Sequence, residues 1–134
     1  MRGQHDTITV WNKAIENNKT VYYRHVVPRC YWRAQVVRNV SGSTVSIGTA
    51  WAVTVEAQDG YKPYSEWLKS NDKSNYFTFN AGDIVALGEH ADDMTAENAS
   101  AVYNSLKPNV CTIKTVADNT QPWKQGRHIA VEGV

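Results

Sequence analysis

Two alternating runs of residues, separated by the turn Ser41-Gly42-Ser43, constrain the fold of this chain more than any other feature. In residues 30–38 the even positions from 30 to 36 are Cys, Trp, Ala and Val, and in residues 45–55 the odd positions are mostly Val, Ile and Trp. Successive side chains of a strand point to opposite faces, so this alternation predicts strands with one buried face. The two runs predict a long β-hairpin whose tip, residues 39–48, projects beyond the body of the domain.

Further strands are predicted by the same criterion along the rest of the chain. They cover residues 6–13, 21–27, 76–79, 84–87, 110–117 and 128–134. The strand at 21–27 is expected to end at Pro28, because proline lacks the N–H that a strand ladder needs. A polar turn over residues 16–19 precedes that strand. Together with the long hairpin, the total is about eight strands.

Helical periodicity appears in one segment that follows Thr95, a candidate N-cap. Its apolar residues recur at 3.6-residue spacing and are Ala99, Val102, Tyr103 and Leu106. Residues 65–69 predict one or two further helical turns, with Ser65 as a possible cap. We therefore predict a mainly β fold in a single domain, residues 1–134. It is a small, partly closed β-barrel or sandwich with a long projecting hairpin, one α-helix and one short helical turn.

Residues that could carry chemistry are scattered. The four histidines form no i,i+4 pair and accompany no close-spaced cysteine pair, so no metal site is predicted. The acidic run at residues 89–93 precedes a helix, where carboxylates favour the helix dipole, and it lacks the ligand pattern of a calcium loop. Phosphate-binding glycine loops and nucleophile motifs are missing. We expect a protein that binds other proteins, without catalytic residues or cofactor.

The first six residues are polar, and the sequence contains no apolar run long enough for a membrane span. We therefore expect neither a secretory leader nor contact with a membrane. In that setting Cys30 and Cys111 are expected to be reduced, buried thiols that pack as small hydrophobic residues.

The charge of the chain is unevenly distributed, although the net charge is only +1. Residues 1–39 contain seven Lys/Arg and two Asp/Glu, a balance of +5. Residues 40–134 contain seven Lys/Arg and eleven Asp/Glu, a balance of −4. A basic part and an acidic part favour head-to-tail contact between identical or related subunits.

Residues 21–33 interleave tyrosines and a tryptophan with three arginines. Aromatic residues that stack on bases, beside arginines that contact phosphates, are how small barrels bind single-stranded nucleic acid. A strand with aromatic residues in the core and arginines outside produces the same string. The small net charge favours this second, structural interpretation.

Tryptophan occurs five times, and most of these side chains are expected in the core. Trp67 and Trp123 lie in loop-flanked segments, where an aromatic side chain more often meets a partner. We therefore take these two residues as candidate partner contacts.

Five stretches that together span most of the chain resemble, by their order, a family of structural proteins. The first reads Val-Val-Pro-Arg-Cys-Tyr-Trp-Arg, and the stretches are residues 26–33, 48–56, 60–67, 76–78 leading into 82–89, and 127–134. The family comprises small proteins of tailed bacteriophages and prophages, often labelled minor capsid or head–tail joining proteins.

The resemblance implies a connector role as a stopper-like β-barrel with a long loop. Such proteins assemble as a ring, expected here to be a hexamer, between the portal-bound adaptor and the tail terminator or tail tube. This implies a place in the virion neck after assembly in the host bacterial cytoplasm, with packaged DNA near the channel. Residues of the hairpin tip would face the channel or a neighbouring ring, namely Asn39, Ser41, Gly42, Ser43 and Thr44. The alternatives are tail completion or head decoration in the same particle, and a small nucleic-acid-binding β-barrel.

Overall fold

The computed structural model describes residues 6–41, 44–119 and 128–134, with side chains described outside residues 35–49 and 119. The strands are β1 (Asp6–Glu16), β2 (Lys19–Ser41), β3 (Thr44–Glu56), β4 (Ile84–Leu87), β5 (Val110–Asn119) and β6 (His128–Gly133). The helices are α1 (Tyr64–Lys69) and α2 (Ala99–Leu106), with a 3₁₀ turn η1 (Lys73–Asn75).

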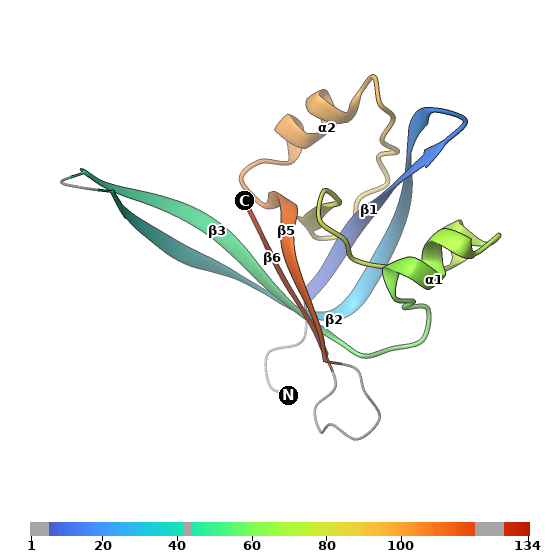
Figure 1. Cartoon of the computed structure of the whole chain (residues 1–134), viewed down its shortest axis with the longest axis horizontal. Helices are drawn as coiled ribbons and strands as arrows, with labels where there is room; N and C mark the ends of the chain where they lie inside the picture. The colour runs from blue at the N-terminus through green and yellow to red at the C-terminus, as the bar shows by residue number, and fades with distance from the viewer. Residues whose placement is uncertain (1–5, 42–43, 120–127) are drawn as a thin grey trace.

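The six strands form one antiparallel sheet that closes on itself (Figure 1). Their order is β1-β2-β3-β6-β5-β4, and β4 returns to pair with residues 8–11 of β1. Ring closure removes the edge strands that an open sheet would expose. The predicted mainly β fold, with a closing barrel-like sheet, a long hairpin and two helical segments, is confirmed.

The prediction that Pro28 ends its strand is wrong, because β2 continues through this residue. Asp6 pairs with Cys30 and Ile8 pairs with Val27, so Pro28 and Arg29 together lie opposite the single residue between Asp6 and Ile8. Such a β-bulge leaves a residue outside the ladder, where the missing N–H of proline is tolerated. Arg29 takes a left-handed backbone conformation there, with φ of 59°. Two of the predicted strands are therefore one long strand.

Residues 76–79 were also predicted to be a strand, but they pair only through an isolated bridge between Tyr61 and Phe77. Phe77 and Phe79 are nevertheless buried inside the ring. Their alternation reflects this burial rather than membership of the sheet. The described residues therefore contain six strands instead of about eight.

The core consists of two apolar clusters on opposite sides of the sheet. The cluster inside the ring contains Ile8, Val10, Val27, Cys30, Trp32, Val53, Val55, Phe77, Phe79, Val85, Cys111, Ile113, Ile129 and Val131. The second lies outside, under α2, and contains Trp11, Ile84, Ala86, Met94 and Val110. Strands β1 and β4 contribute alternate residues to both clusters, so they are buried on both faces.

Helix α2 confirms the periodic segment, whose apolar residues Val102, Tyr103 and Leu106 pack on the outer cluster. Thr95 and Asn98 exchange bonds ahead of it, since each side chain accepts a hydrogen bond from the backbone N–H of the other residue. These bonds close the turn that precedes α2, whose N-cap is Asn98 without a side-chain cap bond, so the predicted cap at Thr95 is wrong. Helix α1 begins after Pro63 and makes no side-chain cap, so the predicted role of Ser65 is wrong.

Two hairpin ends extend past the ring, and they are built differently. The first, residues 12–23, continues β1 and β2 beyond the last pair with β4, and its turn is formed by Asn17 and Asn18 at φ of 53° and 63°. We call it the packed hairpin end. The second is formed by residues 35–41 and 44–50 of β2 and β3, beyond the last pair with β6 (Figure 1). We call it the ribbon.

Candidate interaction surface

The ribbon is the part of the chain that reaches farthest from the body (Figure 1). Seven residue pairs form it, from Gln35 with Ala50 to Ser41 with Thr44. At about 3.3 Å per residue, seven positions reach roughly 20 Å beyond the ring. The predicted tip residues follow this register, because Asn39 pairs with Ser46 and Ser41 with Thr44, whereas Gly42 and Ser43 lie outside the described residues.

The root of the ribbon is held firmly by the core. The rings of Trp32 and Trp51 pack with their centroids 5.1 Å apart. The backbone N–H of Trp32 donates to the Asp6 carboxylate at 3.0 Å. Trp32 is 8% exposed, whereas Ala34, predicted on the same buried face, is exposed. The alternation therefore does not mark a buried position at Ala34.

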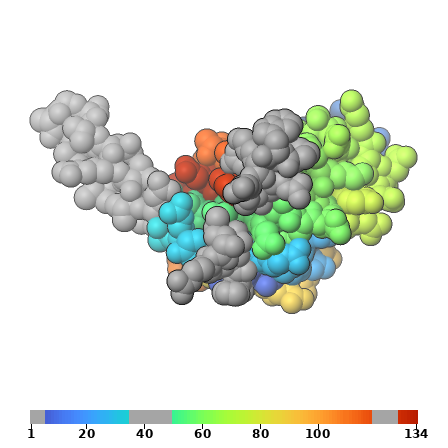
Figure 2. Space-filling view, turned by 90° about the horizontal axis from the view of Figure 1, so that it is seen from below, coloured from blue at the N-terminus to red at the C-terminus, as the bar shows by residue number. Residues whose placement is uncertain are grey.

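Trp67 is fully buried, which corrects its assignment as a partner contact. Its ring packs edge-on against Tyr23 at 5.6 Å, and its indole N–H donates to the Tyr76 carbonyl at 3.1 Å. A six-residue helix in a loop region places its one buried side chain against the packed hairpin end. Figure 2 shows residues of this region, in green to yellow-green, gathered at one end of the body. Trp123 lies outside the described residues.

The aromatic and arginine side chains of residues 21–33 are mostly engaged within the chain. Tyr23 donates to Glu16, which raises the pKa of that phenol to about 12. Arg24 pairs with Asp93, and Arg29 lies 4.0 Å from the Glu56 carboxylate. Tyr31, 41% exposed, and Arg33 face outward. Of the four aromatic residues in this stretch only Trp32 is buried, whereas Tyr22 and Tyr23 are half-buried.

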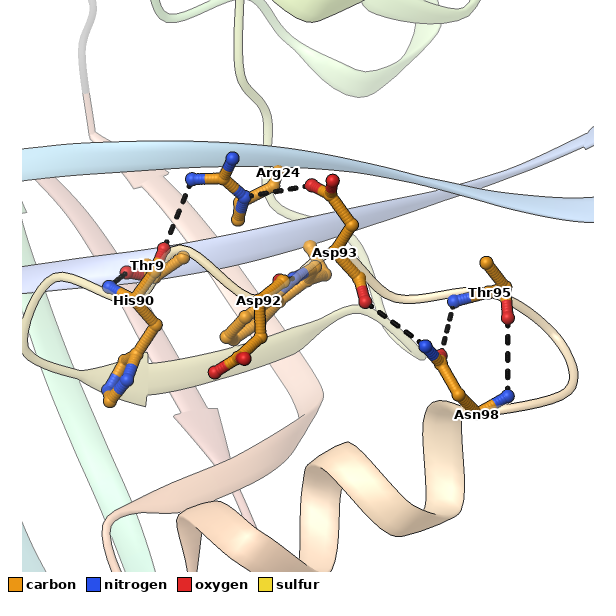
Figure 3. Close-up of polar contacts among 8 residues, drawn as sticks. Thr9, Arg24, His90, Asp92, Asp93, Thr95 and Asn98 are labelled. Atoms are coloured by element: carbon orange, nitrogen blue, oxygen red, sulfur yellow. Dashed lines mark hydrogen bonds and ion pairs between the residues drawn. The ribbon is translucent and has the colours of Figure 1, made fainter.

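The acidic loop, residues 89–97, is fastened to the outside of β1 and β2 (Figure 3). Arg24 donates to the Asp93 carboxylate and to the His90 carbonyl, both at 3.1 Å. The hydroxyl of Thr9 accepts from the His90 N–H, and Trp11 donates to the Asp92 carbonyl at 3.0 Å. These bonds use the loop backbone and one carboxylate, so the other carboxylates of the loop remain on the surface.

A buried carboxylate that the sequence analysis missed lies under the packed hairpin end. Asp83 accepts hydrogen bonds from the Lys13 N–H at 2.9 Å, the Asn12 amide at 2.9 Å and the Asn80 N–H at 3.0 Å. The Asn12 amide also bonds both backbone groups of Thr78. Burial raises the pKa of Asp83 to about 6, against the hydrogen bonds that lower it. The Asn-Ala-Gly-Asp turn was the available signal, since such an aspartate folds back on its own turn.

Chemistry-bearing groups do not converge elsewhere in the described part of the chain. Three or more His, Cys, Asp or Glu side chains placed to hold a metal ion are not found in residues 6–41, 44–119 and 128–134. Cys30 and Cys111 are unpaired and buried, and burial raises the pKa of each thiol to about 12. Within the same ranges, no helix is long and apolar enough to cross a membrane.

Comparison with known proteins gives one match. The model of a family described as "Family of unknown function (DUF6751)" matches residues 4–134. No curated protein and no solved structure matches the chain.

Proposed function

The chain belongs to the DUF6751 family of unknown function, and from its architecture we propose that it is a structural protein of a tailed-bacteriophage particle. In this proposal it forms a stopper-like ring of the head-to-tail connector, joins the portal-bound adaptor to the tail, and helps to retain packaged DNA. Its location is the virion neck, after assembly in the host cytoplasm.

The observation that carries the proposal is the ribbon. A closed ring with its own core needs no projecting strands for stability, and yet β2 and β3 continue for seven pairs past the last ring contact. A connector needs a compact body that packs beside its neighbours and a slender element that reaches the channel or the next ring. The ribbon supplies the second element and the closed sheet supplies the first.

The rigid root of the ribbon supports the same function. The ribbon strands continue directly from core strands, and Trp32 and Trp51 pack together at the junction. The direction of the ribbon therefore follows the orientation of the body. Small polar residues at the tip, among them Ser41, Ser43 and Thr44, suit a contact that forms and releases.

Cryo-electron microscopy of particles from the parent phage tests the location directly. The expected result is a ring of this chain between the adaptor and the tail, with the ribbon tips directed toward the channel. Density on the capsid shell or along the tail would instead support head decoration or tail completion. If the chain is absent from the particle, the proposal fails.

A shortened ribbon tests the function. Residues 36–49 are replaced by Asn-Gly, which is a favoured two-residue turn and joins Gln35 to its partner Ala50. Particles made with this variant should lose packaged DNA or fail to join tails. The control replaces Asn17-Asn18 of the packed hairpin end by Asn-Gly, which keeps that turn type and should leave infectivity unchanged. Normal infectious particles from the shortened variant would refute the gating role.

A further inference from the structure

The ribbon lacks strand partners on its outer edges. Strand β1 follows β2 no further than Cys30, and β6 pairs with β3 only from Trp51 onward. Within the described residues no third strand joins the ribbon, so backbone N–H and C=O groups along both outer edges have no ladder partner. A two-stranded ribbon is marginal alone, and open strand edges pair readily with another chain. The ribbon is therefore built to be covered in an assembly.

The ribbon and its root carry charge of one sign. Residues 29–50 contain three arginines and no Asp or Glu. Arg29 is close to Glu56, whereas Arg33 is exposed and forms no ion pair within the described residues. Arg38 belongs to the ribbon itself and pairs with Ile47. Valine and isoleucine make up most of the remaining large residues, so the expected partner surface is acidic with an apolar part.

The acidic loop has the complementary charge. Residues 89–97 contain four Asp/Glu and no Lys/Arg, and all four carboxylate residues are exposed. Arg24 neutralises Asp93. Glu89, Asp92 and Glu97 form no ion pair within the part of the chain that the structure describes. Because the loop backbone is fastened to β1 and β2 (Figure 3), these carboxylates are presented without much loss of freedom on binding.

A hollow of about 510 Å³ adjoins the acidic loop. It lies between the start of β2 and residues 94–97, and its apolar lining comes from Val21, Tyr22, Met94 and Ala96. In this region β2 pairs fully with β1 on one side, but on the other side only the isolated bridge between Val21 and Thr95 is formed. The hollow thus offers an apolar surface and a largely open strand edge beside the carboxylates.

The ribbon and the acidic loop cannot meet within one molecule. The ribbon projects from one side of the body, and the acidic loop lies across the body from it (Figure 1). Contact between two different surfaces of identical chains is a head-to-tail contact, and repetition of such a contact produces a ring if the rotation closes. The polar distribution of charge in the sequence, basic in residues 1–39 and acidic in 40–134, agrees with this geometry.

We propose that the ribbon of one copy docks on the acidic loop and the adjoining hollow of a second copy, so that the positive charge of Arg33 and Arg38 is matched by the negative charge of Glu89, Asp92 and Glu97. The closure of these contacts into a neck ring rests on the proposed function, whereas the pairing of the two surfaces does not. The occupant of the hollow is a second copy of this chain.

Charge exchange tests this pairing by sedimentation velocity of the full chain at low ionic strength, up to millimolar concentration. R33E/R38E and E89K/D92K/E97K should each weaken self-association at least about tenfold, and an equimolar mixture of the two should restore it. Wild-type association should also weaken in high salt. The control variants E66K and K69E reverse exposed charges on α1 and should associate as wild type does.

Three results overturn the proposal: a wild-type chain that stays monomeric, association that neither variant weakens, and loss of association that mixing does not restore. Unchanged circular dichroism and melting temperature confirm that the variants fold. A self-associating chain absent from the neck would overturn the proposed function and leave this pairing standing. A neck ring whose copies touch elsewhere would overturn this pairing alone.

Discussion

The two hairpin ends that extend past the ring share one strand, β2, and differ in what covers them. The packed hairpin end rests on Asp83 through the Lys13 N–H and the Asn12 amide, and on Trp67 through the ring of Tyr23. The ribbon continues from a root where Trp32 meets Trp51, and within the described residues no third strand pairs with its outer edges. Each hairpin end consists of two strands that, among the described strands, pair only with each other, so strand pairing does not explain the difference between them.

This difference shows where the stability of the chain resides. Local stability follows buried apolar contacts and satisfied buried polar groups, and elements that move or bind lie at its low end. The bulge at Pro28 and Arg29 separates the part of β2 that pairs with β1 from the part that pairs with β3, and the ribbon begins farther on, at Gln35, beyond the last pair with β6. We therefore expect substitutions under the packed hairpin end to unfold the chain, and changes in the ribbon to alter assembly without unfolding it.

The largest expected effect comes from Trp67. The W67A variant removes a fully buried ring and leaves a cavity between α1 and the packed hairpin end, which should lower the free energy of unfolding by about 3–5 kcal/mol. Urea denaturation followed by circular dichroism measures it. L68A, on the same helix but 41% exposed, is the control and should cost less than about 1 kcal/mol. Equal losses for both variants would contradict the assignment of Trp67 to the core.

Removal of the buried carboxylate should have the next largest effect. D83A leaves the Lys13 N–H, the Asn80 N–H and one Asn12 amide hydrogen without their acceptor. Unsatisfied buried donors cost about 1–3 kcal/mol each, and partial access of water should bring the total to about 3 kcal/mol. The same denaturation experiment measures it, with D72A at an exposed position as the control. A loss below about 1 kcal/mol would show that this network does not hold the packed hairpin end.

The pH dependence of stability is a second test of the burial of Asp83. The pKa of Asp83 is about 6 in the folded chain and near 3.8 when unfolded, so between these values the folded state holds a proton that the unfolded state has lost. Stability is then highest below about pH 4 with respect to this group, and it falls as pH rises toward 6, by up to about 3 kcal/mol. Melting temperatures across this window measure the slope. D83N should remove this contribution, and an unchanged slope in D83N would assign it to other groups.

The smallest effect is expected in the ribbon. Replacement of residues 36–49 by Asn-Gly keeps every residue named in the inner and outer clusters, so the free energy of unfolding should stay within about 0.5 kcal/mol of the wild-type value. Thermal melting measures this. A loss comparable with that of W67A would show that the ribbon is part of the folded core, and the contrast between the two hairpin ends would disappear.

Several features of the fold followed from short stretches of sequence. The alternation on both sides of Ser41-Gly42-Ser43 predicted the β2–β3 pairing, and the spacing of Ala99, Val102 and Leu106 predicted α2. Both patterns depend on neighbours within a few residues. Pro28 was misjudged because its consequence depends on the opposing strand, where a bulge makes its missing N–H harmless. Trp67 was misjudged because Tyr23, its packing partner, is distant in sequence.

The candidate surface was only half predictable. The ribbon could be read from the length of two alternating runs, and its tip residues from the turn between them. The acidic loop was visible as a charged run, but nothing local showed that Arg24, Thr9 and Trp11 would fasten it to the barrel. Asp83 was passed over because a carboxylate in a turn is ordinarily exposed, and its burial depends on Asn12 and Lys13, which are distant in the sequence.

By itself the sequence determined the mainly β character of the chain, the β2–β3 hairpin that exceeds the needs of a core, and helix α2, because periodicity and turn residues act over a few positions. Only the tertiary structure decided where the sheet closes, which hairpin end is packed and which is left free. Those outcomes depend on pairing between β1 and β4 and on packing by α1, contacts between segments far apart in the chain. Such contacts leave no pattern in the local sequence, because each of the two segments takes its place only when the distant segment is also in place.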